Sequence, residues 1–121
     1  MKREPDLSRS ILLFVEEHAP ASGGLDRELA IDGYDRATVY AHAQLLIDDG
    51  YIDGKVLEGL GGIFHIMIYR LTSSGHDAIE AMRNDTLWGR AKKTVLEKSI
   101  PFTLTALLQV LKAEAHNHVS F

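Results

Sequence analysis

The stretch 51-YIDGKVLEGLGGIFHIMIYRL-71 decides the fold, because the apolar spacing of the chain changes there from helical to alternating. The run 51–59 predicts a strand, the glycines of 59-GLGG-62 predict a tight turn, and the run 63–71 predicts a second strand. Both faces of the second strand are apolar, with Ile63, Met67, Tyr69 and Leu71 on one and Phe64, Ile66 and Ile68 on the other. A strand with one face in water would alternate instead. We therefore expect the C-terminal helices or another subunit to cover the back of this β-hairpin.

The residues before the hairpin predict two helices. Pro5 suits the first turn of a helix that ends near His18, because 19-APASGG-24 is rich in helix breakers. Asp35 can cap a second helix, and Gly50 ends it. Between the two helices, the run 25-LDRELAI-31 is too short to assign firmly and fits either a brief strand or one helical turn.

The residues after the hairpin predict three further helices. Thr72 can cap the first, a break at 84-ND-85 precedes the second, and Thr103 can cap the last. The order helix, short element, helix, hairpin, helix is that of a winged helix-turn-helix domain. We therefore expect a mainly α protein with a β-hairpin (α+β) and additional C-terminal helices. Residues 1–98 would form the winged-helix-like domain, and residues 99–121 a helix that packs on the same domain or on a dimer partner.

The composition limits the class of protein. A chain of 121 residues fits one domain with a modest core. It has no apolar run of about 18 residues and no signal-peptide pattern at its start, so we expect a cytoplasmic protein without a membrane span. The absence of cysteine excludes disulfides and thiolate metal sites. The net charge is −4, and most of the excess acid lies before residue 50, which argues against a strongly basic nucleic-acid-binding face.

The stretch 70-RLTSSGHDAIEAMRNDTLW-88 resembles a family of uncharacterised bacterial and phage proteins that is catalogued as a domain of unknown function. That family typically shows Arg-Leu-Thr, then Gly-His and an acid, then Arg followed by an acidic pair, Thr and Trp. The matching positions are Arg70, Leu71, Thr72, Gly75, His76, Asp77, Arg83, Asp85, Thr86 and Trp88. The opening MKREPDLSRSILLFVEE and the run 40-YAHAQLLIDDGYI-52 are similar too, so the resemblance spans residues 1–95. The chain departs from the family at Asn84 and at Ser73–Ser74. The resemblance implies a winged-helix-like fold and supplies no activity.

The predicted fold makes DNA binding and transcriptional regulation one hypothesis. The exposed side of the 35–49 helix would carry four candidate contacts to double-stranded DNA: Arg36, Thr38, Tyr40 and Gln44. Arg pairs with guanine edges and Gln with adenine edges in the major groove. Lys55 would touch a phosphate from the wing, and alternative phosphate contacts come from a later helix: Arg90, Lys92 and Lys93. The acids of the 35–49 helix and a wing tip without a cation count against this hypothesis.

The alternative is a non-catalytic protein-interaction or modulator module that uses the fold without binding DNA. The wing carries an apolar, glycine-flexible surface, made by Leu57, Leu60, Ile63 and Phe64. Such a surface is usually covered by a partner or by the chain itself. A homodimer or another protein would serve as that partner, and the two roles can coexist.

The run 72-TSSGHD-77 holds the residue types of a hydrolytic triad, but neighbours on a helix point about 100° apart and rarely act together. We expect a structural junction instead, where Thr72 caps a helix, Gly75 allows close approach to the hairpin and His76 makes a structural hydrogen bond. No other catalytic motif occurs, so we expect no enzyme, no cofactor and no metal. His42 lies on the inner flank of its helix, and we expect it to hydrogen-bond a neighbouring backbone carbonyl.

Overall fold

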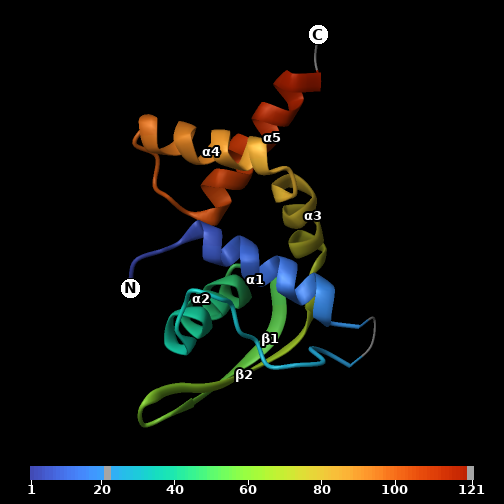
Figure 1. Ribbon diagram of the computed structural model, residues 1–121, viewed down its shortest axis with the longest axis vertical. Helices are drawn as coiled ribbons and strands as arrows, with labels where there is room; N and C mark the ends of the chain where they lie inside the picture. Colours follow the sequence, from blue (N-terminus) through green and yellow to red (C-terminus); the bar gives the residue numbers. More distant parts are fainter. Residues whose placement is uncertain (21–22, 120–121) are drawn as a thin grey trace.

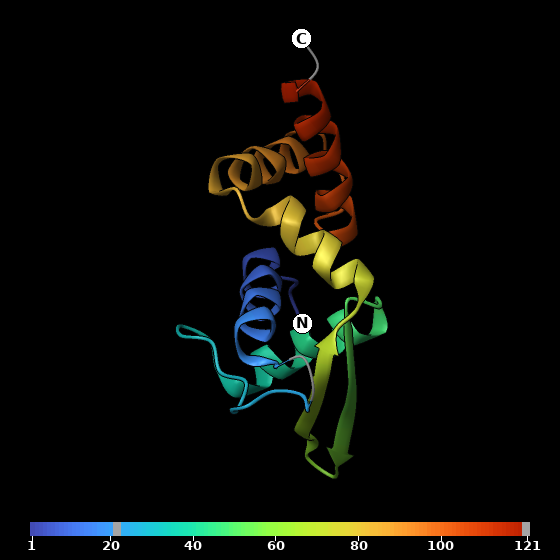
Figure 2. The same cartoon turned by 90° about the vertical axis from the view of Figure 1, so that its right-hand side faces the viewer.

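The computed structural model describes residues 1–20 and 23–119, and these residues form five helices and one antiparallel hairpin (Figure 1). The elements run in the order α1 (Pro5–His18), α2 (Arg36–Asp48), β1 (Ile52–Gly59), β2 (Gly62–Leu71), α3 (Ser73–Met82), α4 (Asp85–Glu97) and α5 (Leu104–Val119). The prediction of a mainly α protein with a β-hairpin is confirmed. The hairpin, α1 and α2 occupy one end of the molecule, and α4 and α5 occupy the other, with α3 between them (Figures 1 and 2).

Helices α1 and α2 begin where the sequence predicts. Pro5 occupies the first turn of α1, and the Asp35 carboxylate accepts a 2.8 Å hydrogen bond from the Thr38 N–H at the start of α2. Each helix buries one face in the core, through Leu7, Ile11, Leu12 and Val15 of α1 and Val39, Ala43 and Leu46 of α2.

The segment between α1 and α2 contains no helix and no strand over residues 23–34, so the prediction of a brief strand or a helical turn at 25–31 is wrong. The Leu25 N–H donates a 3.1 Å hydrogen bond to the Ile68 carbonyl of β2, but the Asp26 N–H then bonds His18 O and turns the chain back. One backbone hydrogen bond therefore joins residues 23–34 to the hairpin. Residues 21–22 of the predicted breaker-rich run lie outside the described residues.

The hairpin pairs Ile52 with Leu71 at its base and Gly59 with Gly62 at its tip. The register shifts twice, which leaves Phe64 and Tyr69 of β2 as bulged residues without a partner in β1. The inner face packs on α1 and α2 and buries Ile66 and Ile68.

The outer face of the hairpin carries Met67, which is 41% exposed. The C-terminal helices lie at the other end of the molecule (Figures 1 and 2). The expectation that these helices cover the hairpin is therefore wrong, because α3 leads the chain away from it.

Helices α3 and α5 begin at the predicted caps, and α4 begins at the predicted break, where Asn84 is its cap. The Thr72 hydroxyl accepts a 3.1 Å bond from the Gly75 N–H, the Asn84 side chain accepts from the Leu87 N–H, and the Thr103 hydroxyl accepts from the Ala106 N–H. Over the described residues, α5 packs on α3 and α4 of the same chain and buries Leu104, Leu107, Leu108 and Leu111. The last two residues of the predicted 99–121 segment lie outside the described residues. In the part of the chain described, no helix has the length and apolar character that a membrane span requires.

Candidate functional site

Arg36 stands at the start of α2, where a DNA contact was predicted. Its Nη2 donates a 2.7 Å hydrogen bond to the Phe64 carbonyl of β2, and its guanidinium lies 4.8 Å from the centre of the Tyr40 ring. Its Nε also lies 3.7 Å from a Glu28 carboxylate oxygen. The side chain is exposed, but it is held against the hairpin rather than extended away from the helix.

Tyr40 is 3% exposed, so the prediction that it lies on an exposed side of α2 is wrong. Helix α2 packs against both α1 and β2, which widens its buried arc beyond the face marked by Val39 and Ala43. Thr38 and Gln44 are half-buried on the same helix.

Lys55 lies opposite Met67 on the outer face of the hairpin, whereas α2 packs on the inner face that buries Ile66. The structure therefore does not bring Arg36 and Lys55 together on one surface.

The cations of α4 are also separate from α2, because α4 lies at the opposite end of the molecule from the hairpin (Figure 1). Lys92 Nζ donates to Asp6 Oδ1 at 2.9 Å, and Lys93 Nζ lies 3.9 Å from a Glu97 carboxylate oxygen. Arg90 is exposed on the same helix. The candidate phosphate contacts therefore form no continuous surface with the exposed side of α2.

Most of the large apolar side chains that are exposed lie on the hairpin. Among the described residues, six large apolar side chains are exposed, and four of these belong to the hairpin: Leu60, Phe64, Met67 and Tyr69. Phe64 and Tyr69 are the two bulged residues, whose side chains leave the regular alternation of the strand. The predicted surface residues Leu57 and Ile63 are half-buried. Sequence reasoning missed Met67 and Tyr69 because it expected other elements to cover them.

Three of the residues that carry the family resemblance, Arg83, Asp85 and Trp88, join α1 to the end of α3 and to α4. Arg83 makes a bidentate pair with Glu16 at 3.1 and 2.8 Å, Arg9 donates to Asp85 at 2.7 Å, and Trp88 Nε1 donates to Asp6 Oδ1 at 2.7 Å.

These contacts shift the ionisation of two α1 carboxyls. The hydrogen bonds from Arg83 lower the pKa of Glu16. Burial acts to raise the pKa of Asp6, but the hydrogen bonds from Trp88 and Lys92 outweigh it and hold that pKa below its usual value. The motif residues Arg83, Asp85 and Trp88 thus act as links between packed helices.

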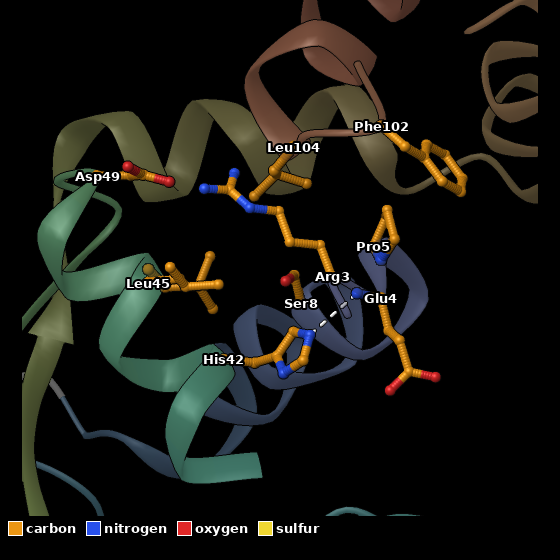
Figure 3. Close-up of a pocket in the computed structure, with 10 residues that line it drawn as sticks. Arg3, Glu4, Pro5, Ser8, His42, Leu45, Asp49, Phe102 and Leu104 are labelled. Atoms are coloured by element: carbon orange, nitrogen blue, oxygen red, sulfur yellow. Dashed lines mark hydrogen bonds between the residues drawn. The ribbon is translucent and has the colours of Figure 1, made fainter. Parts of the chain in front are cut away.

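His42 lines a small cavity between α1, α2 and the start of α5 (Figure 3). The ring is fully buried, with Nδ1 2.9 Å from the Thr38 carbonyl and Nε2 accepting a 2.9 Å hydrogen bond from the Glu4 N–H. The predicted bond to a backbone carbonyl is therefore present. Because Nε2 accepts, Nδ1 carries the proton, and the ring is a structural link between α2 and the start of α1.

The run 72–77 forms the base of α3. A Cβ at Gly75 would collide with the Tyr51 carbonyl oxygen, so the predicted close approach is present. His76 and Asp77 are both exposed, and no hydrogen bond of the His76 ring is found within the described residues, which corrects the expected structural bond. No group of three or more His, Asp or Glu side chains in the described ranges is placed to hold a metal ion.

Comparison with known proteins gives one family and one relative. Residues 2–101 match a family described as "Hypothetical protein (DUF2513)". A Haemophilus influenzae protein described as "Uncharacterized protein" is 37% identical over 110 residues, which cover 91% of this chain and 92% of the relative. No solved structure matches.

Proposed function

The chain belongs to the DUF2513 family, and we propose that it is a non-catalytic interaction module that docks a protein partner through the hairpin. The resemblance predicted from residues 70–88 is thereby confirmed as family membership.

The observation that carries the proposal is the apolar surface of the hairpin. Monomeric proteins seldom gather large apolar side chains in one exposed region, and such regions commonly mark protein contacts. Phe64 is 56% exposed, and Leu60 projects fully into solvent at the tip. Two of the five cations that a nucleic-acid contact would use are held by the protein itself, Arg36 by Phe64 O and Lys92 by Asp6.

The test compares substitutions in the hairpin with a matched one elsewhere. Leu60→Asn combined with Met67→Gln removes apolar surface from the hairpin, and Leu96→Gln removes an exposed leucine from α4. Association is measured by light scattering of the purified chain and by quantitative cross-linking in cells of its natural host. We expect the hairpin variant to lose the cross-linked product and Leu96→Gln to retain it. Equal cross-linking of both variants, or none by the unaltered chain, would contradict the proposal.

DNA binding is the second candidate function, and the position of α2 directly before the hairpin favours it. Helix α2 runs directly into the hairpin, and Thr38 and Gln44 remain half-exposed on it. A mobility-shift screen with random duplexes at low salt tests this function, because phosphate contacts make binding strongest there. Retention that is lost in the Arg36→Ala, Gln44→Ala double variant supports DNA binding. The absence of any retained duplex eliminates it.

A further inference from the structure

One edge of β2 pairs with β1, and the other edge has no neighbouring strand. Along this unpaired edge, some backbone groups bond other parts of the chain and others do not. Ile68 O accepts from Leu25 outside the hairpin, so the pair Gly54–Ile68 is of the type that exchanges no hydrogen bonds within the ladder. Pairs of this type alternate with bonded ones, so the N–H and C=O of Ile66, two residues away, also point outward. Phe64 O points the same way and accepts from Arg36.

The unpaired edge of β2 is therefore hydrogen-bonded at both ends and not at its centre. Leu25 bonds the carbonyl of Ile68, and Arg36 bonds the carbonyl of Phe64. Within the described residues, no hydrogen bond from outside the hairpin reaches Ile66, although that residue is only 6% exposed. Unpaired backbone groups of a nearly buried residue are costly unless water or a ligand satisfies them.

The open part of the edge faces a groove. Its walls are β2 and the segment 23–29, which diverges from β2 after Leu25, and Tyr40 contributes to the lining between them. The groove contains about 580 Å³ of space, continuous with solvent. Most of its lining is apolar, with Leu25, Leu29, Tyr40, Ile66, Met67 and Ile68, but Arg27, Glu28 and His65 also line it.

We propose that this groove takes an extended peptide segment of the protein partner, which pairs with the backbone of Ile66 as a short third strand. The inference rests on the proposed interaction function and names the partner's chemistry. Addition of a strand to an exposed edge supplies backbone hydrogen bonds for affinity and side-chain pockets for selectivity. The bond from Leu25 to Ile68 is the same interaction made by this chain itself, over one residue.

The flanking groups define the sequence of that segment. An apolar side chain of the peptide lies in the groove beside Leu29 and Tyr40. A carboxylate of the peptide follows it toward Arg36, where it replaces the Glu28 carboxylate that lies 3.7 Å from Arg36 Nε in the free protein. The Arg36 guanidinium has five N–H donors and uses one of them for Phe64 O. About four residues of β2 separate the two closed ends, a span of roughly 13 Å, so the paired core of the peptide is about three residues long.

The experiment selects peptides from a display library of random heptapeptides on the immobilised full-length protein. Selected peptides are synthesised with a fluorescent label, and their affinity is measured by polarisation. Each is compared with the same peptide N-methylated at its central amide, which keeps the side chains and removes a strand-pairing donor. Amide chemical shifts of the ¹⁵N-labelled protein locate the bound peptide.

We expect enrichment of peptides with an apolar residue followed by an acid, and the largest amide shifts at Ile66 and its neighbours. N-methylation should weaken binding about tenfold or more, the effect of losing one or two well-formed backbone hydrogen bonds. Arg36→Ala should weaken the acidic peptides about tenfold, as loss of a charge-assisted bond predicts, and should weaken their glutamine analogues clearly less, by the amount that loosening of the distal hairpin alone costs. Lys55→Ala, on the outer face of the hairpin, should change neither.

Three outcomes would overturn the inference. These are no enriched peptide, equal binding of the N-methylated forms, and shifts confined to the tip around Leu60. The last outcome would mean that partners bind the tip of the hairpin and that the groove beside β2 is not the binding site. The proposed function has its own failure, which is equal cross-linking of the hairpin and Leu96 variants.

Discussion

The guanidinium of Arg36 donates a 2.7 Å hydrogen bond to the carbonyl oxygen of Phe64, 28 residues further along the chain. That carbonyl is available because Phe64 is bulged and has no partner in β1. The bond joins the start of α2 to the distal part of the hairpin.

Arg36→Ala should therefore loosen the distal hairpin without unfolding the protein. We expect faster amide exchange and lower order parameters for residues 57–65, with little change in the thermal midpoint, since the side chain is exposed. Arg27→Ala is the matched control, because Arg27 is also exposed and bonds only its neighbour Asp26 among the described residues. Unchanged dynamics in residues 57–65 of the Arg36 variant would show that the bond does not hold the hairpin.

His42→Ala should destabilise the protein by about 2–3 kcal/mol, because it leaves the Glu4 N–H without its acceptor and opens a cavity beside α1. The measurement is chemical unfolding monitored by circular dichroism. His76→Ala is the control and should stay within about 0.5 kcal/mol of the unaltered protein, since His76 is exposed. A similar free energy of unfolding for the two variants would rule out the structural role of His42.

Gly75→Ala and Gly89→Ala should move stability in opposite directions. A Cβ at Gly75 meets the Tyr51 backbone, so we expect a loss of about 1–3 kcal/mol. A Cβ at Gly89 of α4 meets nothing within 4 Å, so alanine should stabilise the helix by about 0.5–1 kcal/mol. Both values come from the same denaturant titration. A neutral Gly75→Ala would mean that α3 can move away from the base of the hairpin at no cost.

Acid should weaken the contacts that join α1 to α3 and α4. The folded state lowers the pKa of Glu16, through hydrogen bonds from Arg83, and the pKa of Asp6, where the bonds from Trp88 and Lys92 outweigh burial. A lowered folded pKa means that the unfolded chain binds the proton more tightly. The stabilisation is therefore complete above the unfolded pKa of about 4 and is lost as the pH falls through the folded values.

Asp6→Asn isolates the charge, because an asparagine oxygen can still accept from the Trp88 indole. We expect the variant to lose less stability than the unaltered protein between pH 5 and about pH 3, measured as the urea midpoint at each pH. Glu17→Gln is the control, since Glu17 is an exposed carboxylate of α1 outside these contacts. The same pH slope in all three proteins would remove Asp6 from the acid response.

Several features were available from the sequence because they depend on neighbours along the chain. Asp35, Thr72 and Thr103 cap helices by bonding N–H groups three residues later, and Pro5 fits the first turn of α1 for a similarly local reason. The change of apolar period at residue 51 marked the hairpin. These local signals determined the order of the elements and the class of the fold.

The candidate site depends instead on which elements lie side by side. Tyr40 is buried and Arg36 is tied down because α2 packs against β2, and Met67 stays exposed because α3 leads the C-terminal helices away from the hairpin. The bond from Leu25 to Ile68 and the opening at Ile66 arise between segments about 40 residues apart, and no local spacing encodes them. The sequence by itself determined where helices and strands begin, since caps and periodicity act within a few residues. Only the tertiary structure decided which side chains and backbone edges remain open to a partner, because burial is a property of the packed elements together.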